Sequence, residues 1–319
     1  MLKNRGQIGH RPVLSRSAVS YELGDRVQVL RHGGIGAMHR LAVNSGLAMG
    51  IDESLKLLKF HKPYHESDHV LSICYNILCG GSSIEDLELL RNDPCFLAAL
   101  GTQRIPDPTT AGDFLRRFDR ASIEKLQDAI NEVRAVLWRE ADTFSSQDAI
   151  IQIDATIEAT DARTKQGMNM GYTGVIGYAP LLVSLANTRE VLYVENRGAN
   201  EHSSTNASYW LDKSFALVKP HCKRVWLRGD TAYGLSEHFD RWHEQNISFV
   251  LGYQAHPDLV ARAEEQNNWR VLQRPTRKVQ TNPRARPADV RQEIVIEKGC
   301  KDFRLLGEQI TEFEYSPVR

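Results

Sequence analysis

The stretch Ala149-Ile150-Ile151-Gln152-Ile153-Asp154 decides the fold of this chain, because an apolar run of strand length ends in a carboxylate. A second run, Val225-Trp226-Leu227-Arg228-Gly229, is followed in the same way by Asp230. Apolar runs of about four to eight residues between turn residues are typical of buried strands. A carboxylate at the end of such a strand is held rigidly at the edge of a sheet. If the two strands are neighbours, Asp154 and Asp230 can share a divalent metal ion, as in metal-dependent nucleases.

The sequence around these two runs predicts a mixed sheet flanked by helices. The expected strands are 149–154, 180–186, 190–196, 224–229 and 247–252, the expected helices are 204–219 and 234–245, and residues 165–178 form a glycine-rich excursion. Three strands with a hairpin, followed by helix, strand, helix and strand, are typical of an α/β domain with a mixed sheet. Further strands are expected at 293–297, 303–306 and 310–315.

The first half of the chain predicts helices, because apolar residues recur at intervals of three and four between residues 36 and 142. Ser83, followed by Asp86, is typical of a capping box. Thr110 is expected to cap a helix that runs through Phe118, and Ser122 is expected to open another that reaches about Ala141. The predicted regions are a basic tail (1–35), a helical region (36–145), an α/β core (146–252) and a basic β-rich region (253–319).

Composition excludes several classes of protein. The chain has 319 residues, of which 41% are apolar and 25% are charged, enough for about two globular domains. Lys and Arg equal Asp and Glu at 40 each, so nucleic acid would have to bind to local basic patches. Five cysteines without a Cys-x-x-Cys pair argue for a reducing compartment and against a disulfide framework or structural zinc. No signal peptide or membrane-spanning run is found, so a cytoplasmic protein without a membrane partner is expected.

Other motifs carry less weight. Three histidines at intervals of four could line a helix face as metal ligands: His61, His65 and His69. Pro63 interrupts this run and no acid or cysteine completes a tetrahedral set, so a solvated helix start is favoured. His202 and Glu195 could orient a substrate at the mouth of the sheet, but solvated loop residues are the simpler interpretation. The chain has no nucleotide-binding glycine motif and no nucleophile elbow.

Three groups of basic residues could contact DNA phosphates, although a solvated surface is favoured for any single arginine. The first group is Lys3, Arg5, Arg11 and Arg16, and the second is Arg116, Arg117 and Arg120. The third group is Arg274, Arg277, Lys278, Arg284 and Arg286. The third is the strongest candidate, because it is dense and low in acids.

Four segments of the second half of the chain are informative together: Asp154-Ala155-Thr156-Ile157, Gly171-Tyr172-Thr173-Gly174-Val175-Ile176-Gly177-Tyr178-Ala179-Pro180-Leu181, Ser184-Leu185-Ala186-Asn187-Thr188 and Leu227-Arg228-Gly229-Asp230-Thr231. They resemble the DDE transposases of bacterial insertion sequences, most closely the group-1 DDE branch of insertion-sequence family 1380. In the N-terminal half, Gly33-Gly34-Ile35, Ser82-Ser83-Ile84-Glu85-Asp86-Leu87 and 107–118 resemble runs of that family. The resemblance covers nearly the whole chain.

The resemblance implies a helical DNA-binding region followed by a ribonuclease-H-like catalytic core. It also implies Mg²⁺-dependent (or Mn²⁺-dependent) strand cleavage and transfer at terminal inverted repeats. Asp154 matches the first acid of the family and Asp230 the second, and both are therefore expected to be catalytic metal ligands. The implied partners are double-stranded DNA, as inverted repeats and target, and a second copy in a homodimer. The implied location is the nucleoid.

The third acid of the family is a Glu on a late helix, within a Tyr/Asn–Arg–Glu pattern that follows a β-rich insertion. Residues 253–319 resemble that insertion, and no Glu with these surroundings follows. The expectation is therefore a C-terminally truncated transposase that lacks this helix and has impaired activity. The alternatives are a catalytically inactive remnant that occupies inverted repeats, and a nuclease that uses Glu264 or Glu265 as its third ligand. Both glutamates lie in a polar run and are expected to face solvent.

Overall fold

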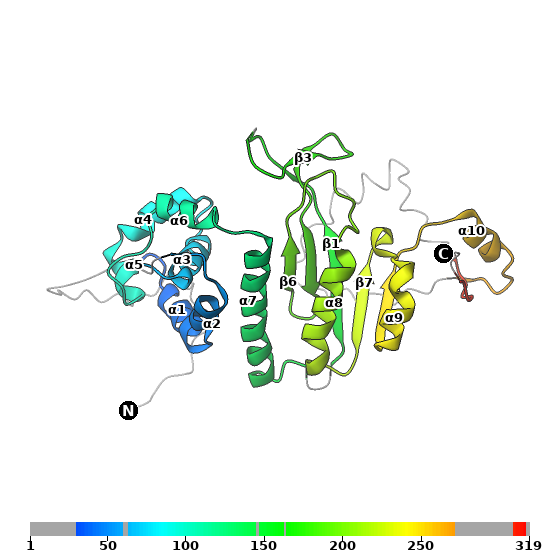
Figure 1. Cartoon of the computed structure of the whole chain (residues 1–319). Helices are drawn as coiled ribbons and strands as arrows, with labels where there is room; N and C mark the ends of the chain where they lie inside the picture. The colour runs from blue at the N-terminus through cyan, green and yellow to red at the C-terminus, as the bar shows by residue number, and fades with distance from the viewer. Residues whose placement is uncertain (1–29, 60–62, 145–146, 163, 272–308, 317–319) are drawn as a thin grey trace, which may run out of the picture. The chain divides into compact units, whose positions relative to one another are not determined.

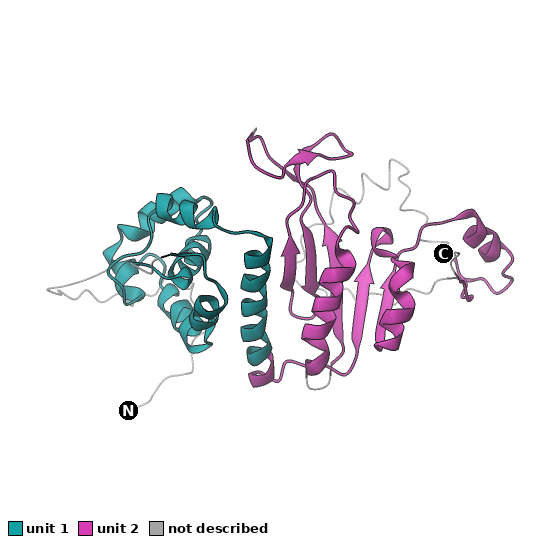
Figure 2. Ribbon diagram, in the orientation of Figure 1, with its two compact units in different colours: residues 1–137 teal, residues 138–319 magenta. Residues whose placement is uncertain are grey.

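The computed structural model describes residues 30–59, 63–144, 147–162, 164–271 and 309–316. The chain divides into two compact units, residues 1–137 and 138–319 (Figure 2). The predicted strands 293–297 and 303–306 lie outside the described residues, as do the first and third groups of basic residues.

The first unit is helical, as the sequence predicts (Figure 1). Its elements are α1 (Ile35–Asn44), α2 (Leu47–Ser54), α3 (Glu66–Leu78), the 3₁₀ turn η2 (Ile84–Asp86), α4 (Leu87–Arg91), α5 (Pro94–Ala99), α6 (Pro108–Leu115) and most of α7 (Arg120–Glu140). Apolar side chains from α1, α3, α4, α5 and α6 form one core, with Leu87 and Phe96 fully buried at its centre. Burial of these side chains is what holds the short helices together, because helices of this length are marginal alone.

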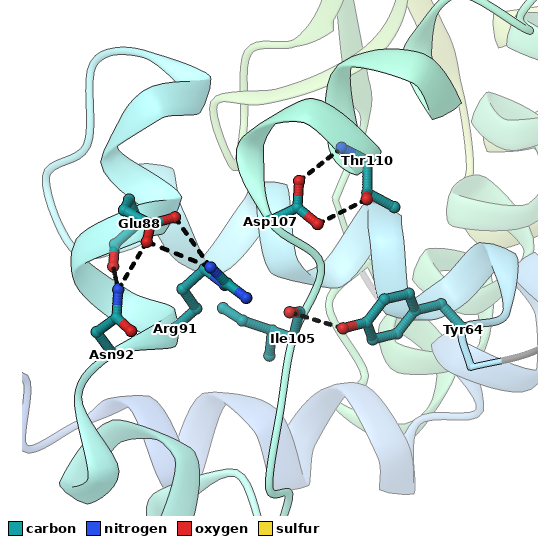
Figure 3. Close-up of polar contacts among 7 residues, drawn as sticks. All are labelled: Tyr64, Glu88, Arg91, Asn92, Ile105, Asp107 and Thr110. Carbon is teal, nitrogen blue, oxygen red and sulfur yellow. Dashed lines mark hydrogen bonds and ion pairs between the residues drawn. The ribbon is translucent and has the colours of Figure 1, made fainter.

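Local hydrogen bonds set where these helices begin. The Ser83–Asp86 capping box is confirmed. The expected cap at Thr110 is wrong, because Asp107 caps α6 and accepts from the Thr110 backbone N at 2.9 Å and its Oγ1 at 2.7 Å (Figure 3). The Asp107 carboxylate satisfies a backbone N–H that has no partner within the helix, which is how an N-cap stabilises a helix start. α7 begins at Arg120, two residues before the predicted Ser122.

The histidine run does not form a solvated helix face. His65 is the N-cap of α3, and His61 lies outside the described residues. His69 is only 3% exposed and stacks on Phe114, with ring centroids 4.4 Å apart. Burial lowers the pKa of His69, which favours the neutral ring. The solvated interpretation is therefore wrong for His69, a core residue.

The second unit contains a five-stranded sheet in the order β6-β5-β1-β7-β8 (Figure 1). The strands are β1 (Ala149–Ala155), β5 (Leu181–Leu185), β6 (Glu190–Glu195), β7 (Val225–Gly229) and β8 (Ile247–Leu251), which confirms all five predicted strands to within two residues. β5 pairs antiparallel with β1 and β6, whereas β7 pairs parallel with β1 and with β8.

Helix α8 (Ala207–Val218) packs on β1, β5 and β6, and α9 (Phe239–Glu244) packs on β8. Trp210, Leu211 and Phe215 of α8 are buried in the core of this unit. The predicted helix 234–245 begins only at Phe239. Two short 3₁₀ turns, η4 (Thr231–Tyr233) and η5 (Ser236–His238), precede it. The chain must turn sharply after β7, and the helical repeat starts once that turn is complete.

Three short strands that periodicity did not predict lie in and just before the glycine-rich excursion 165–178. β2 (Glu158–Ala159), β4 (Ile176–Tyr178) and β3 (Asn169–Met170) form a small sheet in the order β2-β4-β3. A Cβ at Gly177 would lie 2.0 Å from the Glu158 carbonyl oxygen, so only glycine allows this pairing.

The last described elements are α10 (Pro257–Glu264), β9 (Arg270–Val271) and β10 (Gln309–Ile310). β10 agrees with the start of the predicted strand 310–315, whereas 311–316 form no strand. Glu264 and Glu265 at the end of α10 are exposed, as expected. Among the described helices, none has the length and apolar character needed to cross a bilayer.

Candidate active site

Asp154 and Asp230 lie at the same edge of the sheet, at the carboxyl ends of two adjacent parallel strands. Paired residues of β1 and β7 differ by 76 in number, from Ala149 and Val225 to Gln152 and Arg228. Continued for two residues beyond the last pair, the same difference would bring Asp154 opposite Asp230. Neighbouring strands are about 4.8 Å apart, so both carboxylates can reach one cation between them.

The alternation of side chains along β1 directs Asp154 to the exposed face. Ile151 and Ile153 are buried, whereas Asp154 is exposed. Because side chains alternate between the faces of a strand, the apolar residues that fix β1 in the core also fix the direction of the carboxylate. The burial of Ile151 and Ile153 thus determines the side of the sheet on which the Asp154 carboxylate lies.

Among the described residues, both carboxylates accept hydrogen bonds only from nearby backbone. Asp154 Oδ1 accepts from the backbone N of Ala155 at 2.8 Å, and Asp230 Oδ1 accepts from the backbone N of Ala232 at 2.9 Å. Within the described part of the chain, no lysine, arginine or histidine forms an ion pair with either aspartate. Neither carboxylate thus has an ion-pair partner in the described ranges, an arrangement that favours binding of a divalent metal ion.

Two glycines allow close packing of the backbone beneath the aspartates. A Cβ at Gly229 would lie 3.1–3.2 Å from side chains of Leu251, Ile153 and Tyr233. A Cβ at Gly252 would lie 2.6 Å from the backbone N of Thr231. The Gly252 backbone N also donates to the Gly229 carbonyl oxygen at 3.2 Å. The end of β8 therefore fixes the backbone that carries Asp230.

Tyr233, which the sequence analysis did not single out, is buried beside this pair. Its side chain is 1% exposed and belongs to the core of the second unit. Burial raises the pKa of the Tyr233 hydroxyl, and the nearby charges of Asp154 and Asp230 raise it further. The phenol therefore stays protonated and can donate a hydrogen bond. Its spacing, three residues after Asp230, was the only available signal.

Arg197 is a second residue that the sequence analysis missed. It is 7% exposed, and burial lowers the pKa of its guanidinium. Nε donates to the Ala179 carbonyl oxygen at 3.1 Å, and Nη1 donates to those of His202, Ser203 and Thr205 at 3.2, 3.1 and 2.8 Å. An arginine in an Asn-Arg-Gly turn is normally taken for a surface residue, so nothing in the sequence marks it as buried.

The expectation that Glu195 and His202 are solvated loop residues holds for only one of them. Glu195 accepts from Asn206 Nδ2 at 2.9 Å and from Trp210 Nε1 at 2.7 Å, which connects β6 to the start of α8. His202 is exposed, and its Nδ1 lies 2.7 Å from Ser204 Oγ. Solvation describes His202 but not Glu195, whose contacts are structural.

The predicted DNA-contacting residues that the structure describes lie in the first unit. Arg116 is exposed and forms an ion pair with Asp113 at 2.7 Å. Arg117 is exposed, and its Nη1 donates to the Leu57 carbonyl oxygen at 3.2 Å. Arg274, Arg277, Lys278, Arg284 and Arg286 lie outside the described residues.

The donor atoms at the strand ends suit a hard divalent ion. Carboxylate oxygens are the ligands that Mg²⁺ and Mn²⁺ prefer. In the described ranges, no group of three or more His, Cys, Asp or Glu side chains is arranged to hold a metal. Asp154 and Asp230 could supply two oxygen ligands to such an ion.

Comparison with known proteins gave one family and several structures. No curated protein matched the chain. The piggyBac transposase synaptic complex with hairpin DNA matched with 11% identity and a TM-score of 0.36, over 72% of this chain and 52% of that one. The Mos1 transposase paired-end complex with left transposon end matched with 10% identity and a TM-score of 0.21, over 57% of each chain. The Mos1 strand transfer complex matched with 12% identity and a TM-score of 0.22, over 61% of this chain and 63% of that one.

The chain thus spans about half to two thirds of the length of these solved structures. The family match is broader, because the model of transposase DDE domain group 1 matches residues 23–294. That range contains both strand-end aspartates and most of the two units. The chain therefore belongs to the group-1 family of transposase DDE domains.

Proposed function

We propose that this protein acts in DNA transposition, binding the inverted repeats of an insertion sequence and cutting and transferring DNA strands with Mg²⁺ or Mn²⁺. The observation that carries the proposal is the placement of Asp154 and Asp230 at the ends of adjacent parallel strands. Family membership supports it, because DDE transposase domains use divalent metal ions in general. The finer assignment to insertion-sequence family 1380 rests on the sequence resemblance.

The sheet is proposed to be a ribonuclease-H-like core. The order β6-β5-β1-β7-β8, with only β5 antiparallel to β1, supports this assignment. In such a core, Asp154 and Asp230 would hold the metal ion. A bound divalent ion supplies Lewis-acid stabilisation of the charge that develops on the phosphate.

DNA is proposed to bind through the helical region 36–145 and the basic β-rich region 253–319. The exposure of Arg116 and Arg117 supports contact with phosphates. Arg274, Arg277, Lys278, Arg284 and Arg286 are proposed as a second contact, on the basis of their density of charge. Two copies are proposed to act together on the two ends of the element, in the cell's nucleoid.

The test replaces each aspartate and measures binding and cleavage separately. Asp154→Ala and Asp230→Ala are expected to lower cleavage of DNA from the element's ends by about 10²–10³-fold, because charge stabilisation of the transition state is lost. Binding of the same DNA without a divalent ion, followed by fluorescence anisotropy, is expected to be unchanged. A large loss of binding in both variants would contradict the assignment.

Matched controls use exposed acids on α10. Asp258→Ala is expected to cleave like the wild type. Glu264→Ala and Glu265→Ala separate the proposed function from a nuclease that uses one of them as third ligand, because only that nuclease would lose cleavage. Specific binding without cleavage by the wild type at any Mg²⁺ or Mn²⁺ concentration would instead support an inactive DNA-binding protein.

A further inference from the structure

The proposed function assigns no role to the glycine-rich excursion 165–178. This segment contains four glycines, and Lys165 is its only charged residue, although 25% of the residues in the whole chain are charged. A segment without acids can approach a phosphate backbone without electrostatic repulsion, and glycines leave room for close contact. The composition of the excursion therefore suits contact with DNA.

The excursion stands beside the candidate active site. Only residues 155–157 separate Asp154 from β2, and β4 pairs antiparallel with β2 before the chain enters β5. The first residue of β5, Leu181, pairs with Ala155, which directly follows Asp154. Figure 1 shows the small sheet β2-β4-β3 projecting beyond the end of β1. DNA held at the two aspartates therefore has this small sheet beside it.

A three-residue hairpin loop closes the small sheet at its tip. The Gly171 backbone N donates to the Val175 carbonyl oxygen at 2.8 Å, and the Gly174 backbone N donates to the Gly171 carbonyl oxygen at 2.9 Å. Gly174 has a φ of 77°, a left-handed conformation that glycine adopts without strain. A β-turn followed by a left-handed glycine is a common hairpin loop, and it places Tyr172 and Thr173 at the tip.

The backbone that follows β6 holds this hairpin in place. The Ala199 backbone N donates to the Gly177 carbonyl oxygen at 3.2 Å, and the Ala179 backbone N donates to the Arg197 carbonyl oxygen at 2.8 Å. A Cβ at Gly171 would lie 3.0 Å from the Ala199 carbonyl oxygen, so the base of the loop packs directly on this backbone. The tip therefore has a firm support.

Apolar side chains gather at the tip and face solvent. Tyr172 is 92% exposed, and Met170 and Ile176, which pair across β3 and β4, are 58% and 46% exposed. Exposed apolar groups that gather in this way mark interaction sites. A supported loop thus presents an aromatic ring beside the candidate active site.

We propose that Tyr172 stacks on an unpaired base of the bound DNA. The inference rests on the proposed function, since it takes DNA as the partner of the site. Every base has an aromatic face, so stacking on a tyrosine ring tolerates any base sequence. Bases at a cut strand end unpair at low cost, and cleavage next to Asp154 and Asp230 supplies such an end.

The competing explanation is that the tip binds protein, such as a second copy of this chain. The lack of acids in 165–178 favours DNA, and so does the position of the small sheet directly after Asp154. The two explanations differ in Tyr172→Ala. Loss of stacking weakens binding to DNA bases, whereas loss of a protein contact lowers the molar mass in solution.

The experiment measures binding of the full chain to an oligothymidylate and to an abasic strand of the same length, by fluorescence anisotropy in EDTA. Tyr172→Ala is expected to raise the Kd for the oligothymidylate about 5–150-fold, the usual effect of removing one stacked aromatic residue. Tyr172→Phe keeps the ring and is expected to match the wild type. All three proteins are expected to bind the abasic strand equally, because it keeps the phosphates and lacks the bases.

Tyr209→Ala is the matched control, because Tyr209 is a 43% exposed tyrosine of the same unit, on α8. Its Kd for the oligothymidylate is expected to match the wild type. Since the Tyr172 side chain is almost fully exposed, the Tm of Tyr172→Ala is expected to equal that of the wild type.

The outcomes separate this inference from the proposed function. Equal Kd values of the wild type and Tyr172→Ala for the oligothymidylate overturn the inference alone, and so does a Tyr172→Phe protein that binds as weakly as Tyr172→Ala. A wild type that binds duplex DNA from the element's ends but not the oligothymidylate also overturns the inference alone. A wild type that binds neither overturns both. A lower molar mass of Tyr172→Ala in sedimentation, with unchanged DNA binding, overturns the inference and assigns the tip to a second copy.

Discussion

The two ends of strands β1 and β7 carry the same residue type in opposite surroundings. At the amino-terminal end, Asp148 accepts two hydrogen bonds from Arg224, at 3.1 and 2.7 Å, and one from Trp226 Nε1 at 3.1 Å. At the carboxyl-terminal end, Asp154 and Asp230 accept only from nearby backbone, as far as the described residues show. The comparison teaches that an aspartate paired with an arginine is a structural residue, whereas one without a described cation beside it is a candidate metal ligand.

The largest expected effect comes from the tight backbone packing at the carboxyl-terminal end. Gly252→Ala places a methyl group 2.6 Å from the Thr231 backbone N and 3.0 Å from the Asp230 carbonyl carbon. Because backbone cannot move aside cheaply, we expect the free energy of unfolding to fall by about 1–3 kcal/mol. Cleavage should fall with it, since Asp230 is displaced. Urea unfolding and a cleavage assay measure the two effects.

The control for this change is Gly50→Ala, inside α2, where a Cβ meets nothing within 4 Å. Alanine is the better helix former, so the same substitution should stabilise the first unit by about 0.5–1 kcal/mol. A Gly252→Ala protein as stable as the wild type would show that the backbone beneath Asp230 is not fixed as described.

A smaller effect, on the Tm, directly tests the contrast between Asp148 at the amino-terminal end and Asp154 at the carboxyl-terminal end of β1. Without divalent ions, Asp148→Ala is expected to lower the Tm, because Arg224 and Trp226 lose their acceptor. Asp154→Ala is expected to leave the Tm unchanged or raise it, because repulsion from Asp230 is relieved. Differential scanning calorimetry in EDTA measures both. Equal losses of Tm in the two variants would remove the distinction between the ends.

The smallest effect is a pH dependence at the amino-terminal end. Hydrogen bonds from Arg224, and then from Trp226, lower the pKa of Asp148. A carboxyl with a lowered folded pKa adds stability above its unfolded pKa, near 3.9, and that stability is lost as pH falls through the folded value. Melts of the wild type between about pH 5 and 2.5 should therefore show a steeper fall of Tm than melts of Asp148→Asn. Parallel curves would contradict this contribution.

Sequence patterns predicted the sheet well because its strands are buried. β1, β5 and β7 are apolar runs bounded by turn residues, and such runs form buried strands in most folds. The short strands β2, β3 and β4 were not predicted, because a strand of two or three residues is too short to show a period. The cap of α6 was misplaced by three residues, since Asp107 and Thr110 are both good caps and only geometry decides between them.

The site was predictable only in part. The strand-end position marked Asp154 and Asp230, and the parallel pairing of β1 with β7 places them together. Tyr233 and Arg197 were not predicted, because neither belongs to an apolar run or a known motif that would mark its burial. His69 shows the same limit, since its stacking on Phe114 joins α3 to α6.

The pairing of β1 with strands on both sides has a consequence for which insertions and deletions the gene can tolerate. β1 is matched residue by residue to β5 and to β7, so one inserted codon within 149–154 would move the carboxylate to the opposite face of the sheet. Residues between Ala155 and Leu181 leave the large sheet and return to it, so their number can change while both strand ends stay fixed. Functional copies of this gene should therefore vary in length between β1 and β5 and keep a constant length within β1.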